Sequence, residues 1–187
     1  MIYLDSGIYI LAWQRAKQLT NLELINFVRS RDAATRNLII QELHARPFED
    51  VFQAALLLIS EGQAQSRASG YLILGQLGTP DRPFRDRSTP IILQGLEKER
   101  VATVQSAILY AIGHLKPPQS THKEILKKIH YLLSKKTRSI LIASAFSLRG
   151  LSISEELELV VRKIVESGDP EAIDWALLGI ESLKDCS

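Results

Sequence analysis

The sequence predicts an all-α protein, a right-handed α-solenoid of about five helix pairs preceded by an N-terminal capping helix. One helical phrase recurs five times with its apolar residues in the same register: RNLIIQELHAR from Arg36, RASGYLILGQL from Arg67, QSAILYAIGHL from Gln105, RSILIASAFSL from Arg138 and IDWALLGIESL from Ile173. These starts lie 31, 38, 33 and 35 residues apart, a period typical of stacked helix pairs. No segment alternates apolar and polar residues with period two, so no sheet is expected.

The 187 residues suit a single domain over 1–187. The cap occupies 1–19, with a helix from Ser6 to Leu19 whose Ile10, Leu11 and Trp13 are expected to cover the first repeat. The repeats span approximately 20–46, 47–78, 84–116, 120–151 and 152–184. Each pairs a first helix with the recurring second helix. The first helices are expected at 21–30, 48–59, 89–97, 121–133 and 154–165, and the second helices at 36–46, 66–77, 101–115, 137–148 and 170–183.

Local signals support these helix starts. Three hydroxyl–carboxylate pairs have the spacing of a capping box, namely Thr20 with Glu23, Thr121 with Glu124 and Ser152 with Glu155. Two dipeptides place an N-cap residue before a proline in the first turn, Thr89-Pro90 and Asp169-Pro170.

Each second helix carries an apolar stripe. Offsets three, four, seven and ten from the phrase starts are almost always apolar, as with Ile108, Leu109, Ile112 and Leu115 in the third repeat and Ala176, Leu177, Ile180 and Leu183 in the fifth. Gly70, Gly75 and Gly113 interrupt these helices. A helical glycine costs roughly 1 kcal/mol relative to alanine, so we expect close helix–helix approach at these positions to compensate.

The stretch LINFVRSRDAATRNLIIQEL, from Leu24 to Leu43, resembles a short bacterial HEAT repeat: an apolar helix, an Asp-containing turn, an arginine and a second apolar helix. The segment SRASGYLILGQLG, from Ser66 to Gly78, resembles the second helix of the same family. The arginine is absent at Gln105 and Ile173. The resemblance implies a solenoid that serves as a scaffold, inhibitor, adaptor or, in some members, an enzyme.

The second-helix arginines Arg36, Arg67 and Arg138 allow two interpretations. They could form an anion-binding ladder. The favoured interpretation is structural, with each guanidinium bonding loop carbonyls or an acidic residue of an adjacent repeat.

Composition excludes several function classes. The formal net charge of +2 lacks the basic excess typical of nucleic-acid binders, so nucleic acid is an unlikely partner. Cys186 is the lone cysteine, the N-terminus lacks a secretory signal, and no apolar run is long enough to span a membrane. The four histidines have no metal-ligand spacing, and no catalytic motif occurs. We therefore expect a cytoplasmic, monomeric, non-enzymatic protein without a metal or cofactor.

Binding is predicted on the concave face of the second helices. Residues off the core stripe mix aromatic, amide and small groups there, a composition typical of protein-binding surfaces. The segment TPDRPFRDRSTP, from Thr79 to Pro90, is expected to be an exposed loop, either a plain connection or a partner-contacting projection. The predicted partner-binding residues are Gln41, Leu72, Gln76, Tyr110, His114 and Trp175, with Arg82, Arg85 and Arg87 at the rim.

The predicted function is a non-enzymatic scaffold that binds another protein, with an immunity protein neutralising a cognate bacterial toxin as one class. The alternatives are a general protein-complex adaptor or a HEAT-like alkylpurine DNA glycosylase. Such glycosylases are expected to combine a basic concave groove with aromatic residues and a carboxylate. Asp174-Trp175 is the nearest match in this chain.

Overall fold

The computed structural model describes residues 6–29, 32–135 and 137–184, and all regular structure in these ranges is helical. The all-α prediction is therefore confirmed for the described part of the chain. Its α-helices are α1 (Ser6–Lys17), α2 (Asn21–Val28), α3 (Ala33–His44), α4 (Glu49–Ser60), α5 (Ala64–Gln76), α6 (Arg85–Lys98), α7 (Ala102–Leu115), α8 (His122–Leu133), α9 (Arg138–Ser147), α10 (Glu155–Glu166) and α11 (Pro170–Lys184). Two 3-10 turns, η1 (Gln119–Thr121) and η2 (Leu148–Gly150), precede α8 and follow α9.

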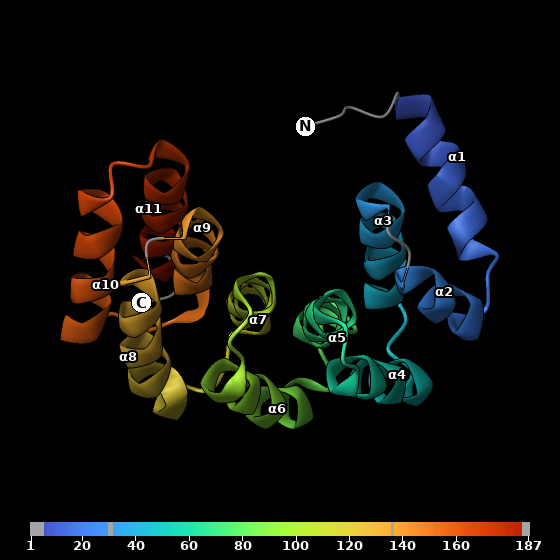
Figure 1. Ribbon diagram of the computed structural model, residues 1–187, viewed down its shortest axis with the longest axis horizontal. Coiled ribbons are helices and arrows are strands. Elements are labelled where there is room, and N and C mark those ends of the chain that lie inside the picture. Colours follow the sequence, from blue (N-terminus) through green and yellow to red (C-terminus); the bar gives the residue numbers. More distant parts are fainter. Residues whose placement is uncertain (1–5, 30–31, 136, 185–187) are drawn as a thin grey trace.

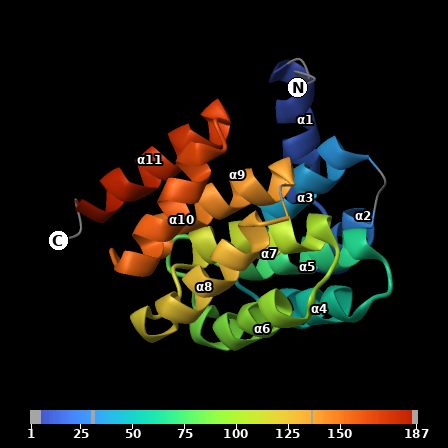
Figure 2. The ribbon, with the colours of Figure 1, turned by 60° about the vertical axis from the view of Figure 1, so that its left-hand side comes forward.

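The helices after α1 lie in pairs along an arc (Figure 1). We call α3, α5, α7, α9 and α11 the inner row, because they lie on the inside of the arc, and α2, α4, α6, α8 and α10 the outer row. Within the inner row α5 contacts α7, α7 contacts α9 and α9 contacts α11. Figure 2 shows α5, α7 and α9 running alongside one another. The inner row is thus a continuous helical surface.

The third repeat begins earlier than its sequence suggests. The Ser88 N–H donates to the Phe84 carbonyl over 2.8 Å, and α6 starts at Arg85 with Pro90 inside it. The prediction that Thr89-Pro90 opens this helix is wrong. Proline removes only one backbone hydrogen bond there, and the Thr89 hydroxyl donates to the Arg85 carbonyl over 2.9 Å. The expected loop over 79–90 therefore ends before Arg85.

Two of the predicted helix starts are confirmed by their hydrogen bonds. The Thr20 N–H donates to the Glu23 carboxylate over 2.8 Å, and the Glu23 N–H donates to the Thr20 hydroxyl over 3.3 Å. Asp169 accepts from the Ala172 N–H over 3.1 Å at the start of α11.

The other two capping boxes are wrong. The Thr121 hydroxyl donates to the Pro118 carbonyl over 2.7 Å, because η1 precedes α8. Ser154 caps α10 by accepting from the Leu157 N–H over 3.2 Å. The Ser152 N–H is directed elsewhere, to Nδ1 of His122 over 2.9 Å.

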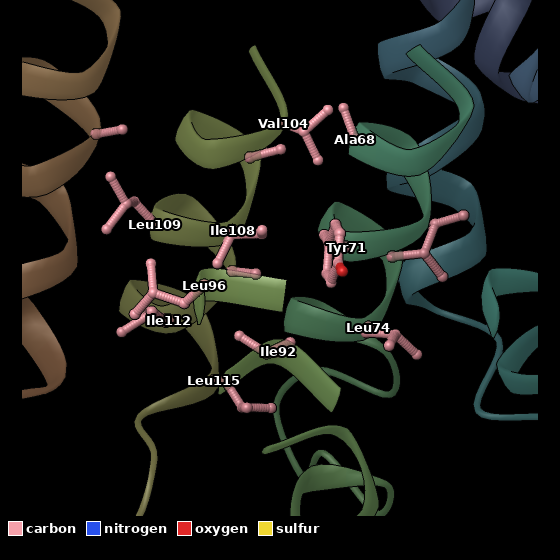
Figure 3. Packing of buried hydrophobic residues seen from close by; sticks show 14 of the residues in the cluster. Ala68, Tyr71, Leu74, Ile92, Leu96, Val104, Ile108, Leu109, Ile112 and Leu115 are labelled. Carbon is pink, nitrogen blue, oxygen red and sulfur yellow. The ribbon is translucent and has the colours of Figure 1, made fainter. Parts of the chain in front are cut away.

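The core lies between the two rows. Figure 3 shows Tyr71 of α5, Ile92 of α6 and Ile108 of α7 converging between their helices, and all three are buried. The predicted stripe fails at the C-terminal end of the arc, where Leu177 is 52% exposed although Ala176 is buried. No described helix follows α11 to cover that side. The side chain of Leu183 lies outside the described residues.

Close approach between inner helices occurs where the sequence places glycine. A Cβ built on Gly75 would lie 2.6 Å from the Cα of Ala111 on α7. A Cβ on Gly113 would lie 2.8 Å from the carbonyl oxygen of Phe146 on α9. Both distances are far below van der Waals contact, which confirms that packing compensates for these helical glycines.

The N-terminal helix packs differently from the prediction. Trp13 is 41% exposed, with the Lys17 Nζ 4.0 Å from its ring centroid, so it does not cover the first repeat. Among the described side chains of α1, Ala16 is buried, and Leu19, which follows the helix, also packs against the core. The small Ala16 lets α1 approach α3, which it contacts. The side chains of Ile10 and Leu11, and the whole of Cys186, lie outside the described residues. None of the described helices has the length and apolar character needed to cross a membrane.

Candidate functional site

An aromatic cluster joins three helices of the inner row. Phe146 of α9 is its centre, with its ring centroid 5.2 Å from that of Tyr110, 4.8 Å from that of His114 and 5.1 Å from that of Trp175. Tyr110 and Trp175 meet Phe146 edge to face, an arrangement that aromatic pairs favour. Phe146 is buried, whereas the other three are half-buried. The half-buried rings therefore remain available for contact with a ligand.

Two arginines place positive charge beside this cluster. The Arg149 guanidinium lies 5.1 Å from the Phe146 ring centroid and 6.0 Å from that of Trp175. Burial, followed by the charges of Arg149 and Arg82, lowers the pKa of His114 to about 4. His114 is thus a neutral imidazole at pH 7. The Nε of Arg82 is buried and has no hydrogen-bond partner among the described residues.

A carboxylate lies within electrostatic range of the cluster. Burial and the negative charge of Glu171 raise the pKa of Tyr110. Glu171 precedes Trp175 by four residues on α11, so the two side chains share a helix face. The Nη2 of Arg138 donates to Glu171 over 2.8 Å and fixes its position. Asp174, the carboxylate singled out in the sequence, is exposed and about 100° around the helix from Trp175.

The structure brings together only some of the predicted binding residues. Tyr110, His114 and Trp175 form the cluster with Phe146. Gln41 is exposed on α3, and Leu72 and Gln76 are half-buried on α5. These three residues therefore come from inner-row helices other than α7, α9 and α11, which carry the cluster.

The three rim arginines do not gather at one place. Arg82 lies near His114, as its effect on that pKa indicates. Arg87 lies on the outer row, where it donates to both oxygens of Glu49 over 2.7 and 2.8 Å and stacks 4.1 Å from the Phe52 ring centroid. Arg85, the first residue of α6, is exposed. Helix α6 thus directs Arg87 away from the inner face.

The structural interpretation of the second-helix arginines is confirmed for two of them. The Nε of Arg67 donates to Glu99 of the next repeat over 2.9 Å, and its Nη1 donates to the Gly62 carbonyl over 2.7 Å. The Nε of Arg138 donates to Asp169 of the next repeat over 2.7 Å. These guanidinium groups are occupied in joining repeats, which is incompatible with a free anion-binding ladder.

Two neutral histidines make stability depend on pH. Burial lowers the pKa of His44 to about 4, and Nε2 of His44 lies 3.1 Å from the Leu72 carbonyl, to which its neutral tautomer can donate. Because the unfolded chain binds a proton near pH 6.5, stability should fall as the pH drops from about 6.5 towards about 4, by up to about 1.4 kcal/mol per pH unit for His44. Urea midpoints at pH 7.5 and 5.0 measure this loss. His44→Gln should reduce the difference between the two urea midpoints. An unchanged difference would show that His44 is not the source of this pH dependence.

Sequence reasoning missed three residues of this site. Phe146 lies at offset eight of the fourth phrase, outside the apolar offsets three, four, seven and ten. Arg149 follows the phrase, in η2. Glu171 could have been found from the sequence, because it precedes Trp175 by four residues on one predicted helix and this spacing places both side chains on the same face.

Comparison with known proteins gives a fold match. No protein-family model matches the chain, and no curated protein sequence matches it. The X-ray structure of Escherichia coli YibA is similar over 98% of this chain and 66% of that chain, with 18% sequence identity and a TM-score of 0.77. The chain thus spans just under two thirds of YibA. At this identity the likeness shows the fold alone.

The main functional prediction is corrected on this finding. The sequence predicted a non-enzymatic protein-binding scaffold, with toxin immunity as one class, and the comparison does not support that prediction; the match to YibA is one of fold, and it leaves the HEAT-like alkylpurine DNA glycosylase alternative to be argued from the site. Protein binding and toxin immunity have no support in the comparison. The expected aromatic anchors of that surface, Tyr110 and Trp175, pack against Phe146 rather than standing alone.

Proposed function

We propose that the chain is a single domain over 1–187 built as a right-handed α-solenoid of about five HEAT-like helix pairs. The recurring phrases and the contacts between successive inner helices support this architecture. The inner row would then be its concave face. The single cysteine, Cys186, suits the cytoplasmic location expected from the sequence.

On this architecture we propose a HEAT-like alkylpurine DNA glycosylase, which removes an alkylated purine from DNA. One observation carries the proposal: the Arg149 guanidinium lies against the aromatic cluster of the inner row, and Trp175 of that cluster shares a helix face with the Glu171 carboxylate. The proposal departs from the expectations of a non-enzymatic chain and of an unlikely nucleic-acid partner. The net charge of +2 averages over the whole chain, whereas Arg149 lies at the cluster itself.

The half-buried rings suit the leaving group. An alkylated purine carries a positive charge, and cations bind favourably over tyrosine and tryptophan faces. Tyr110 and Trp175 can hold such a base from α7 and α11, with the buried Phe146 fixing both rings. When the bond between base and sugar breaks, its electron pair leaves with the base, which becomes neutral, and positive charge develops on the sugar. Water then adds to the sugar carbon and releases a proton to solvent. A fixed carboxylate such as Glu171 stabilises that developing charge.

The arginines suit the DNA backbone. Arg149 is exposed in η2, directly after α9, and Arg82 is half-buried near His114. Guanidinium groups donate paired hydrogen bonds to phosphate oxygens. Binding to DNA through them should weaken steeply as salt increases, because phosphate contacts release counterions.

Release of 3-methyladenine and 7-methylguanine from methylated duplex DNA tests the proposed function. Chromatography of the freed bases should show release by the unmodified protein under single-turnover conditions. Trp175→Ala should slow release by about tenfold or more, since stacking on one aromatic side chain contributes about 1–3 kcal/mol per base.

Trp13→Ala is a matched control, because Trp13 is the other of the two tryptophans and lies on α1. It should leave base release unchanged. Absence of release by the unmodified protein, or equal losses in the two tryptophan variants, would rule out this function for the aromatic cluster.

A further inference from the structure

A second charged site lies on the outer row, away from the aromatic cluster. Helices α6 and α8 are neighbours in the outer row (Figures 1 and 2). A groove of about 370 Å³ is lined by residues of α6, of α8 and of the segments that follow them. Its charged lining residues are Arg100, Lys127, Lys128, Lys135, Glu97 and Glu124. Four cations against two carboxylates give the groove a surplus of two positive charges.

Few of these cations are neutralised within the protein. The Lys128 Nζ lies 3.5 Å from the Glu97 carboxylate, the one ion pair found among the described lining residues. The Nη1 of Arg100 donates to the carbonyls of Glu97 and Glu99 over 2.7 and 3.0 Å, which leaves its charge without a carboxylate partner. Lys127 and Lys135 have no carboxylate within ion-pair distance among the described residues. Their mutual repulsion would be relieved by a bound anion.

An exposed aromatic ring lies among these cations. Tyr131 is 58% exposed, and the Nζ atoms of Lys128 and Lys135 lie 5.7 and 5.6 Å from its ring centroid. The position of Lys135 beyond the last turn of α8 is explained by the helix dipole, which favours a cation there. The dipole does not explain the position of Lys127, which lies one turn before Tyr131 on the same face of α8. The groove thus pairs a flat aromatic surface with two unneutralised ammonium groups.

We infer that this groove binds a nucleoside phosphate. The base stacks on Tyr131, as bases stack on exposed aromatic side chains in many nucleic-acid-binding proteins. The phosphate oxygens accept hydrogen bonds from Lys127, Lys135 and Arg100. The Glu97 and Glu124 carboxylates can accept hydrogen bonds from ribose hydroxyl or base amino groups. An acidic peptide offers no such use for these two carboxylates, and its own carboxylates would be repelled by them. The groove volume lies within the usual range for small-ligand sites, roughly 300–1,000 Å³.

Calorimetric titration of the full chain with ATP, adenosine and inorganic tripolyphosphate tests this inference. ATP should bind more tightly than either of the other two probes, because only ATP offers both a base and phosphates. Tyr131→Ala should weaken ATP binding by about tenfold and leave tripolyphosphate binding unchanged. The double variant Lys127→Ala/Lys135→Ala should weaken the binding of both.

Lys123→Ala is a matched control, because Lys123 lies on the same helix but pairs with Glu156 over 3.1 Å outside the groove. It should bind ATP as the unmodified chain does. Two outcomes would overturn the inference: no ATP binding by the unmodified chain, or a glutamate-rich peptide that binds as tightly as ATP and is insensitive to Tyr131→Ala. Base release from methylated DNA does not involve this groove, so either activity can fail without the other.

Discussion

Gly75→Ala is expected to destabilise the fold by about 2 kcal/mol, although alanine is the better helix former by about 1 kcal/mol. The new Cβ would lie 2.6 Å from the Cα of Ala111, 2.7 Å from its Cβ and 3.1 Å from its carbonyl oxygen. Two of these are backbone atoms of α7, so relief requires α5 and α7 to separate. For a chain of this size the thermal midpoint should fall by about 4–8 °C.

Gly62→Ala provides the matched control. A Cβ at Gly62 would meet no heavy atom within 4 Å, so the thermal midpoint should stay the same or rise slightly. A second comparison isolates the contact itself. Ala111→Gly removes one of the clashing atoms, so the double variant Gly75→Ala/Ala111→Gly should be more stable than the sum of the two single changes predicts. Equal midpoints for Gly75→Ala and the unmodified protein would show that α5 and α7 are not packed this closely.

The sequence was sufficient for the helices because the repeat period and the apolar register are local, repeated signals. The phrase from Gln105 predicts a second helix over 101–115, and α7 spans Ala102–Leu115. The structure departs from the sequence-based prediction where a local sequence rule competes with packing or hydrogen bonding in the folded chain. The sequence places a helix start at Pro90, but the helix begins earlier, as the hydrogen bond from the Ser88 N–H to the Phe84 carbonyl shows. Leu177 follows the core register but remains exposed because no described helix packs over it.

The site was less predictable because its residues come from different repeats. Tyr110 and Trp175 stand out in the sequence as aromatic residues off the core stripe, yet nothing local indicates that both meet Phe146. Net charge does not locate a site, because it averages over the whole chain. Arg67 and Arg138 pair with acidic residues of another repeat, whereas Arg149 lies beside the cluster.

Glu171→Gln is expected to reduce base release by about 10²–10³-fold, the usual loss when a fixed electrostatic partner of a transition state is removed. This prediction depends on the proposed glycosylase function. Glutamine keeps the size of the side chain and removes its charge, so ground-state stacking on Trp175 should persist. Stability should change little, because Glu171 is half exposed and its pairing with Arg138 is a surface ion pair. The measurement is the single-turnover rate of base release, with DNA binding recorded separately.

Asp174→Asn tests which carboxylate takes part in base release: Glu171, as the structure suggests, or Asp174, as the sequence suggests. Both variants remove one negative charge from α11, so any general electrostatic effect on DNA binding should be shared between them. Only Glu171 lies on the Trp175 face and influences the pKa of Tyr110. Asp174→Asn should therefore release bases at nearly the unmodified rate. If Asp174→Asn abolishes release while Glu171→Gln does not, the carboxylate acts from the other face of α11, and the aromatic cluster is not where the sugar binds.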